Sequence, residues 1–236
     1  MEIEVPEPGG TLNTGPVTVP RLAATVILVR GGSECLQVLL VRRNPSARLM
    51  GGVWVFPGGS VDPGDEVLHD ESESEDGDRG GAGGGAGDGA GGSAVLRALQ
   101  TAAARELREE AGIELAPGAE LLPFARWITP AELLMRFDAW FFLAAAPDGV
   151  EPAVDGSEIV DHAWYAPADA LEAATRGELA LVFPTIKQLQ RLSGFATADA
   201  LLAATREHEV VAIQPQVVVS DGRPHVVLPD DPVHGR

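Results

Sequence analysis

Cysteine is almost absent from this chain. The 236 residues contain a single cysteine, Cys35, so no intramolecular disulfide framework can form. Lone cysteines in β-rich segments are most often buried thiols without chemistry, and we expect this of Cys35. The scarcity of cysteine also fits a reducing compartment, and we expect a cytoplasmic protein.

Positive charge is scarce too. Lys and Arg total 17 against 35 Asp and Glu, which gives a formal net charge of −18. The backbone of a nucleic acid would be repelled by such a chain, so nucleic acid is not expected as a partner. A small phosphorylated substrate carried by a divalent cation remains compatible with this charge.

Long apolar runs are missing as well. No run reaches the roughly 18 apolar residues of a membrane-spanning helix, and residues 1–20 lack the basic and apolar regions of a signal peptide. We therefore expect no contact with a membrane.

The chain has the length of one domain with additions. Residues 1–20 are expected to be a flexible lead-in, residues 21–195 the folded domain, and residues 196–236 a C-terminal helix with β-like runs that form an added hairpin or a homodimer contact. Strands and helices alternate in the pattern of an α/β fold. Strands are predicted at 22–30, 36–41, 53–56, 121–127, 137–144 and 158–165, and helices at 94–111, 167–175, 183–192 and 196–209.

One segment has low complexity. Residues 66–93 begin with an acidic stretch and continue as a Gly/Ala run with almost no apolar side chain to bury. We expect this segment to be a disordered surface insertion.

The helix predicted at 94–111 carries a cluster of acids near its end. Ser93 is a candidate N-cap and Gly112 a candidate C′ residue. Glu106, Glu109 and Glu110 are spaced i, i+3 and i+4, so their side chains fall on one edge of the helix. Such a charged edge is often only a solvated surface. Three converging carboxylates are also the hard oxygen ligands that Mg²⁺ or Mn²⁺ prefers.

A glycine pair upstream favours the metal interpretation. Pro57-Gly58-Gly59 follows a short apolar run and predicts a turn. Backbone groups of this turn can approach a metal-bound phosphate because no Cβ intervenes.

Together these residues resemble the box of the Nudix hydrolases, G-x5-E-x7-R-E-U-x-E-E-x-G-U, where U is apolar. The second half of the pattern is matched by Arg105, Glu106, Leu107, Glu109, Glu110, Gly112 and Ile113. In the first half, counting from Gly59, the glutamate position falls on Asp65, and residues 66–104 stand where the pattern allows seven. The resemblance implies a Nudix α/β/α sandwich with a mixed sheet over residues 21–195, in which Asp65 or Glu66 supports the arginine.

The resemblance also implies a reaction and roles for the site residues. The reaction is hydrolysis of the diphosphate in a nucleoside diphosphate derivative. Glu106, Glu109 and Glu110, with the Gly58 carbonyl, would hold Mg²⁺ or Mn²⁺, and Arg105 would orient Glu106. Glu109 is the first candidate for the general base, and Glu158, Asp155 and Glu151 are the downstream alternatives.

A basic segment upstream resembles Nudix enzymes that cleave coenzyme A. Their pattern L-L-T-x-R-[S/A]-x3-R-x3-G-x3-F-P-G-G is followed by Leu39-Leu40, Arg43, Arg48, Gly52 and Phe56 to Gly59, with Val41 in place of Thr and Asn44 in place of Ser or Ala. Arg43 and Arg48 would bind substrate phosphates, or else balance the charge of the acidic box. The interrupted box likewise resembles the branch that contains the peroxisomal coenzyme A diphosphatases.

The sequence leaves three functions open. The first is cleavage of coenzyme A or an acyl derivative to 3′,5′-ADP and the phosphopantetheine product. The second is the same chemistry on ADP-ribose, NADH or a nucleoside triphosphate. The third is a non-catalytic Nudix-fold sensor that binds a nucleotide, although sensors tend to lose box acids that this chain retains.

Overall fold

The computed structural model describes residues 12–47, 50–65, 90–220 and 223–228. The sheet of the domain has the strand order β3-β2-β1-β6-β5-β8, with β4 paired to β1 and β7 paired to β2. Its strands are β1 (Arg21–Arg30), β2 (Gln37–Arg43), β3 (Trp54–Val55), β4 (Gly58–Ser60), β5 (Leu122–Ile128), β6 (Phe137–Ala145), β7 (Ile159–Tyr165) and β8 (Ala212–Ile213). The pairs β1·β6 and β5·β8 are parallel and the others antiparallel, so the sheet is mixed.

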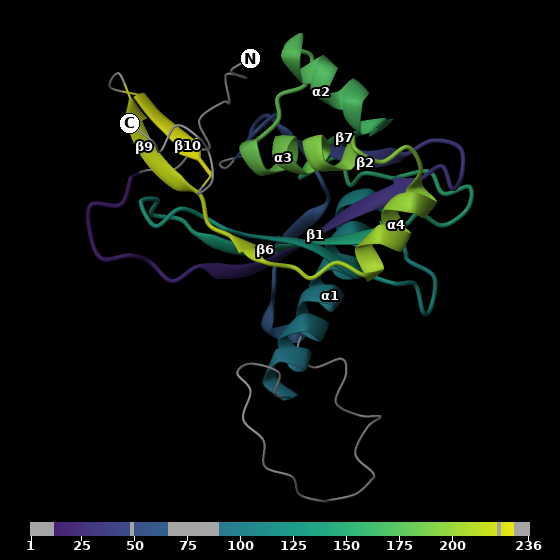
Figure 1. Ribbon diagram of the computed structural model, residues 1–236, viewed down its shortest axis with the longest axis horizontal. Coiled ribbons are helices and arrows are strands. Elements are labelled where there is room, and N and C mark those ends of the chain that lie inside the picture. The colour runs from purple at the N-terminus through teal and green to yellow at the C-terminus, as the bar shows by residue number, and fades with distance from the viewer. Residues whose placement is uncertain (1–11, 48–49, 66–89, 221–222, 229–236) are drawn as a thin grey trace, which may run out of the picture.

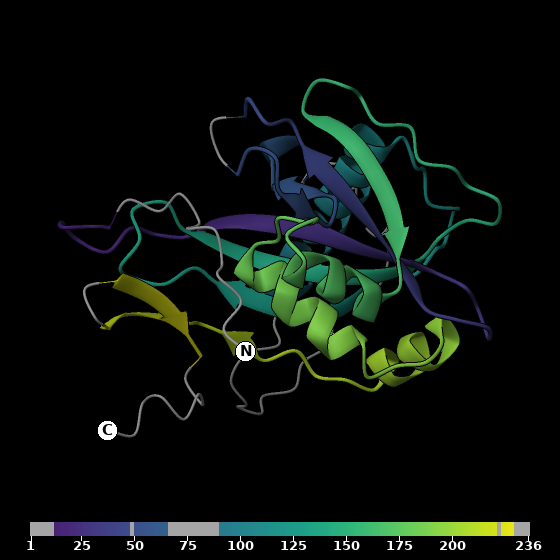
Figure 2. The same cartoon turned by 90° about the horizontal axis from the view of Figure 1, so that it is seen from above.

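Helices cover both faces of this sheet (Figure 1). Helix α1 (Ala90–Ala111) lies on one face, and α2 (Pro167–Thr175), α3 (Phe183–Leu192) and α4 (Ala198–Arg206) lie on the other. The view from above shows α2, α3 and α4 together over the same side of the sheet (Figure 2). The α/β/α sandwich and mixed sheet predicted from the sequence are confirmed.

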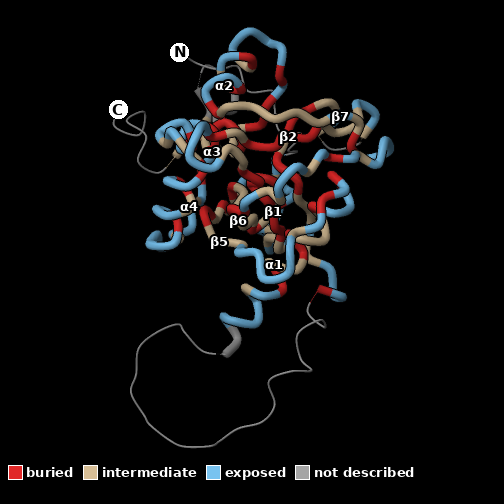
Figure 3. Tube along the Cα trace, turned by 90° about the vertical axis from the view of Figure 1, so that its right-hand side faces the viewer, coloured by how far each residue is buried: buried red, intermediate tan, exposed pale blue. Residues whose placement is uncertain are grey.

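Strand β1 shows why the sheet needs cover on two sides. Ala24, Val26 and Leu28 pack in the apolar cluster of α1, whereas Ile27 and Val29 pack in the cluster of α2, α3 and α4. Successive side chains of a strand point to opposite faces, so a run of apolar residues requires apolar partners above and below. The buried part of the chain accordingly lies between the helical layers (Figure 3).

The sequence predicts the C-terminal end of α1 correctly but not its start. Gly112 has a φ of 64° and donates its N–H to Arg108 O at 3.0 Å, as expected of a C′ glycine. The predicted start is too late, because α1 begins at Ala90 within the Gly/Ala run. Ser93 is therefore not an N-cap, and its Oγ accepts from Arg97 Nη1 at 2.6 Å. The rest of the predicted insertion, residues 66–89, lies outside the described residues.

Two further expectations are wrong. Cys35 is exposed, because it lies in the connection between β1 and β2 and not in a strand. The predicted glycine turn is instead the strand β4, in which Gly58 and Gly59 pair with Thr25 and Ala24 of β1.

Thr18, near the N-terminal end of the described chain, contacts the domain, and Leu228 at the other end packs against the core. Residues 12–20 run beside the β5–β6 connection, where Thr18 Oγ1 donates to Leu134 O at 2.9 Å and Arg136 Nη1 donates to Thr18 O at 2.6 Å. Beyond α4, β9 (Gln216–Ser220) and β10 (Arg223–Val227) form a separate two-stranded hairpin. A homodimer contact through this hairpin stays a prediction. Within the described ranges, no helix has the length and apolar content needed to cross a membrane.

Candidate active site

The site lies where the last turns of α1 cross strand β4. Ala103, Leu107 and Ala111 are fully buried against the sheet, and this fixes the rotation of the helix. The acids at 106 and 110 then stand at the border of the buried face, beside β4. The helical spacing seen in the sequence therefore brings the predicted carboxylates to one place.

The glycine pair is required by close packing. A Cβ on Gly58 would stand 2.6 Å from Ala24 O and 2.6 Å from Thr25 Oγ1 of β1. A Cβ on Gly59 would collide with the carboxylate of Glu106, whose Cδ would lie at 2.5 Å. The two glycines thus let β4 pair with β1 and let Glu106 approach the strand.

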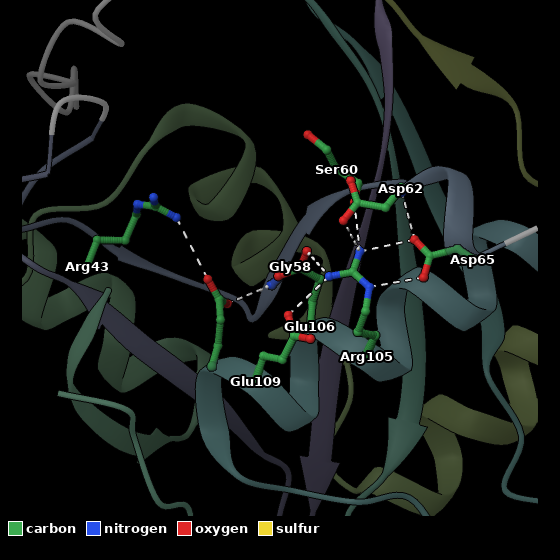
Figure 4. Close-up of polar contacts among 9 residues, drawn as sticks. Arg43, Gly58, Ser60, Asp62, Asp65, Arg105, Glu106 and Glu109 are labelled. Atoms are coloured by element: carbon green, nitrogen blue, oxygen red, sulfur yellow. Dashed lines mark hydrogen bonds and ion pairs between the residues drawn. The ribbon is translucent and has the colours of Figure 1, made fainter. Parts of the chain in front are cut away.

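Arg105 is the centre of the polar network (Figure 4). Its Nε and Nη2 donate to Asp65 Oδ1 and Oδ2, each at 3.0 Å, and Nη2 also donates to Ser60 O at 3.0 Å. This two-pronged ion pair ties α1 to the residues that follow β4. Asp65 therefore stands where the resemblance expects the supporting acid, and Glu66 lies outside the described residues.

Asp62 and Ser60 belong to this network although sequence reasoning did not single them out. Asp62 Oδ2 lies 3.7 Å from Arg105 Nη2, and the Asp62 N–H donates to Asp65 Oδ2 at 2.7 Å. An Asp side chain often bonds to a backbone amide three residues away, as Asp65 does here with Asp62. The spacing Asp62-x-x-Asp65 could therefore have predicted this contact from the sequence.

Glu106 and Glu109 share one nitrogen of Arg105. Nη1 donates to Glu106 Oε1 at 2.8 Å and to Glu109 Oε2 at 3.1 Å. Burial raises the pKa of Glu106, against the opposing effect of Arg105. The side chain of Glu109 is 51% exposed.

Glu110 is the most enclosed acid of the three, with a side chain that is only 5% exposed. Its Oε2 accepts from the Gly58 N–H at 2.9 Å. Burial raises its pKa to about 8, and the neighbouring charge of Glu106 acts in the same direction. The negative charge at this point is therefore only partly compensated by the protein.

Arg43, at the end of β2, approaches the acids from the opposite side. Its Nη1 lies 3.8 Å from Glu110 Oε1, and its Nη2 donates to Glu158 Oε1 at 2.9 Å. Its Nε is buried and has no partner among the described residues. Arg43 and Glu158 thus join the box acids in one site, whereas Arg48 lies outside the described residues.

A divalent cation is chemically suited to these residues. Glu106 and Glu110 are carboxylates held close together with raised pKa values, and a cation would relieve their repulsion. Among the residues that the structure describes, however, no three acids, histidines or cysteines are already arranged as a metal-binding group. Glu106 and Glu109 each give one carboxylate oxygen to Arg105, so a cation would bind through the second oxygen of each side chain or displace this contact.

Comparisons with known proteins agree with this geometry. The family model of the NUDIX domain matches residues 97–185. A curated protein of Caenorhabditis elegans that is named as nudix hydrolase 7 is 30% identical over a 209-residue alignment. This alignment covers 73% of this chain and 60% of that protein. The chain thus spans about three fifths of the length of this relative.

A solved structure extends the likeness to three dimensions. The crystal structure of a NUDIX hydrolase from Alicyclobacillus acidocaldarius superposes with a TM-score of 0.60 and 26% identity, over 79% of this chain and 96% of that one. The matched sequence region contains Arg105 and the three acids of α1, and the matched fold contains the sheet that holds them. Residues 97–185 therefore match the NUDIX domain, and the fold around them is similar to that of a solved NUDIX hydrolase.

Proposed function

We propose that this protein is a metal-dependent hydrolase that cleaves the diphosphate linkage of a nucleoside diphosphate derivative. The observation that carries the proposal is the buried, partly compensated Glu110 next to Glu106, opposite the arginine Arg43. Acids that lack full compensation attract a cation, and an arginine with spare donors attracts a phosphate. A metal–diphosphate complex satisfies both needs at once.

Glu106, Glu109 and Glu110 would hold Mg²⁺ or Mn²⁺, with the Gly58 carbonyl as a further ligand. When bound, the cation neutralises the diphosphate and acidifies the attacking water. Arg105 keeps Glu106 at the strand through its contacts with Asp65 and Ser60. Arg43 would offer a substrate phosphate the donor that now faces Glu110, because a bound cation would take over the charge that Arg43 balances.

In the reaction, the water oxygen bonds to one phosphorus and the bridging P–O bond breaks. One water proton passes to a general base, and the displaced phosphate leaves as an anion. We propose Glu109 as this base, since its side chain is half exposed and contacts only Arg105 among the described residues. Glu158 is the alternative, at 2.9 Å from Arg43.

Coenzyme A, free or acylated, is the substrate that we propose. The support is the spacing of Arg43, Arg48 and Gly52 ahead of Phe56 to Gly59, which resembles coenzyme A diphosphatases. An arginine fork suits the 3′-phosphate that distinguishes coenzyme A from ADP-ribose and NADH. The products are 3′,5′-ADP and phosphopantetheine or its acyl derivative.

Product analysis tests the activity and the substrate together. The protein is incubated with coenzyme A, ADP-ribose, NADH and nucleoside triphosphates, with Mg²⁺ and then Mn²⁺, and products are identified by mass. We expect 3′,5′-ADP from coenzyme A and a loss of turnover of about a hundredfold or more in Glu109→Gln and in Glu110→Gln. Glu114→Gln, which changes an exposed acid just beyond α1, is the matched control.

The other outcomes are distinct. AMP from ADP-ribose or NADH, with coenzyme A intact, would keep the hydrolase and replace the substrate. Nucleotide binding without turnover of any substrate would favour the sensor. Wild-type turnover in Glu110→Gln would remove Glu110 from the set of ligands.

A further inference from the structure

The loop that leads into β7 is built around Asp155. Asp155 Oδ2 accepts from the N–H groups of Ser157 at 3.1 Å and Glu158 at 2.9 Å, and also from Ser157 Oγ. Its Oδ1 accepts from Ile159 N at 2.8 Å. One carboxylate therefore fixes three successive backbone amides, and the last of them begins β7.

Asn44 fastens the same loop from the other side. Its side-chain Nδ2 donates to Ser157 O at 2.7 Å, and its backbone N–H donates to Glu158 O at 2.8 Å. Its Oδ1 accepts from Ser46 N at 2.9 Å, which also holds the segment after β2. Asn44 is one of the two residues that depart from the coenzyme A pattern. Because it is adjacent to Arg43, it connects the end of β2 to the loop of Glu158.

Glu158 is the residue that this loop presents to the site. Its side chain is 59% exposed, and its Oε1 accepts from Arg43 Nη2 at 2.9 Å. An exposed carboxylate normally samples several rotamers, and an exposed ion pair contributes little when its backbone is mobile. Here the backbone of Glu158 is held through both its N–H and its carbonyl.

We infer that Asp155 and Asn44 are positioning residues that fix Glu158, and that Glu158 in turn holds the Arg43 guanidinium in the pose that receives a substrate phosphate. This inference rests on the proposed function for the identity of the ligand. It assigns to Asp155 a role other than that of a base, because its oxygens are occupied by amides of its own loop. The bonds from Ser157 and the following amides also lower the pKa of Asp155 to about 2, so it remains an ionised acceptor at neutral pH.

A double-mutant cycle on Asp155 and Glu158, with ligand affinity as the measured quantity, tests whether Asp155 acts through Glu158. The affinity for 3′,5′-ADP with Mg²⁺ is measured by calorimetry for wild type, Asp155→Ala, Glu158→Ala and the double variant. We expect each single change to weaken binding about tenfold, and the double variant to bind no more weakly than Glu158→Ala. A product of the two losses, about a hundredfold, would overturn the inference, because Asp155 would then act independently of Glu158.

Two controls separate positioning from general stability. Asn44→Ala should weaken binding in the same direction, whereas Asp148→Ala, an exposed acid of the β6–β7 connection, should not. Amide hydrogen exchange at Glu158 and Ile159 should speed up in Asp155→Ala at an unchanged melting temperature. Unchanged exchange, or no binding of 3′,5′-ADP by the wild type, would overturn the inference. Turnover of the substrate panel is scored separately, so a protein that binds 3′,5′-ADP without hydrolysis contradicts only the proposed function.

Discussion

At the scale of single residues, Glu110 is an acid that the fold removes almost completely from water. Its folded-state pKa of about 8 lies above the ordinary value of 4.5, mainly because it is buried. Between these two pH values the folded protein holds a proton that the unfolded chain has released. The contribution of Glu110 to the free energy of unfolding of the metal-free protein therefore falls as pH rises through this window.

Replacing Glu110 with glutamine removes this dependence. The amide side chain of the Glu110→Gln variant still offers an oxygen to the Gly58 N–H but carries no charge at any pH. We expect the variant to gain stability relative to wild type, by up to a few kcal/mol, as pH rises from about 4.5 to about 8. Urea midpoints measured with a chelator across this range provide the test.

The matched control is again Glu114→Gln, which should follow the wild type at every pH. If the stabilities of wild type and Glu110→Gln changed with pH in parallel, the pKa of Glu110 would not be raised in the folded protein. Added Mg²⁺ should reduce the difference, since a bound cation stabilises the ionised form.

Prediction from sequence was strongest for residues on a regular element. The spacing of Glu106, Glu109 and Glu110 places them together on any α-helix, and the structure brings 106 and 110 to β4 as expected. The part played by Asn44 could not be predicted in this way. Its partners Ser157 and Glu158 are more than a hundred positions away in the chain, and only the pairing of β2 with β7 brings them near.

At the scale of elements, Arg105 joins α1 to β4 through Ser60 O and to the residues after β4 through Asp65. Burial alone would raise the pKa of Asp65, but its bonds with Arg105 and the Asp62 amide outweigh burial and lower it. A lowered folded-state pKa gives stability that is present above the unfolded pKa and is lost as pH falls through the folded value.

We expect Asp65→Asn to lower the free energy of unfolding at pH 7 by about 1–3 kcal/mol, because the buried side chain loses a charged, two-pronged contact. The difference from wild type should shrink in acid, where Asp65 itself becomes protonated. Denaturant midpoints at pH 7 and in acid measure both effects. Asp62→Asn, whose side chain is 68% exposed, should change stability much less, and equal losses would contradict the role given to Asp65.

The element that sequence reasoning misjudged is β4. Pro57-Gly58-Gly59 has the composition of a turn, and nothing local distinguishes it from one. It is a strand because β1 lies alongside, with Ala24 O and Thr25 too close for any Cβ at position 58. The pairing that decides this conformation lies more than thirty positions upstream in the chain.

At the scale of the whole molecule, helix α4 and strand β8 belong to the main core. Leu201 of α4 is fully buried in the same apolar cluster as β1 and β5, and β8 extends the sheet beside β5. A boundary was predicted at 195 because the resemblance implies a Nudix domain that ends there. A family pattern cannot report on packing by residues that it does not contain.

Truncation measures this contribution. A chain that ends at 195 should lose about 3 kcal/mol or more, roughly 10 °C in melting temperature, since it loses Leu201 and its neighbours from the core. A chain that ends at 214 keeps α4 and β8 and should lose less. Equal melting temperatures for the full chain and the chain ending at 195 would show that the core is complete without α4.

The parallel pairing of β1 with β6 also sets an order of events during synthesis. Strand β1 meets β6 along its length, from Arg21 beside Phe137 to Val29 beside Ala145. The ribosome must therefore release residue 145 before this ladder can close, and the entropy of closing so long a loop makes the step slow. Until then, β1 has an open edge rich in Val, Ile and Leu. A nascent chain stalled before residue 137 is thus the stage at which this protein is most prone to aggregate.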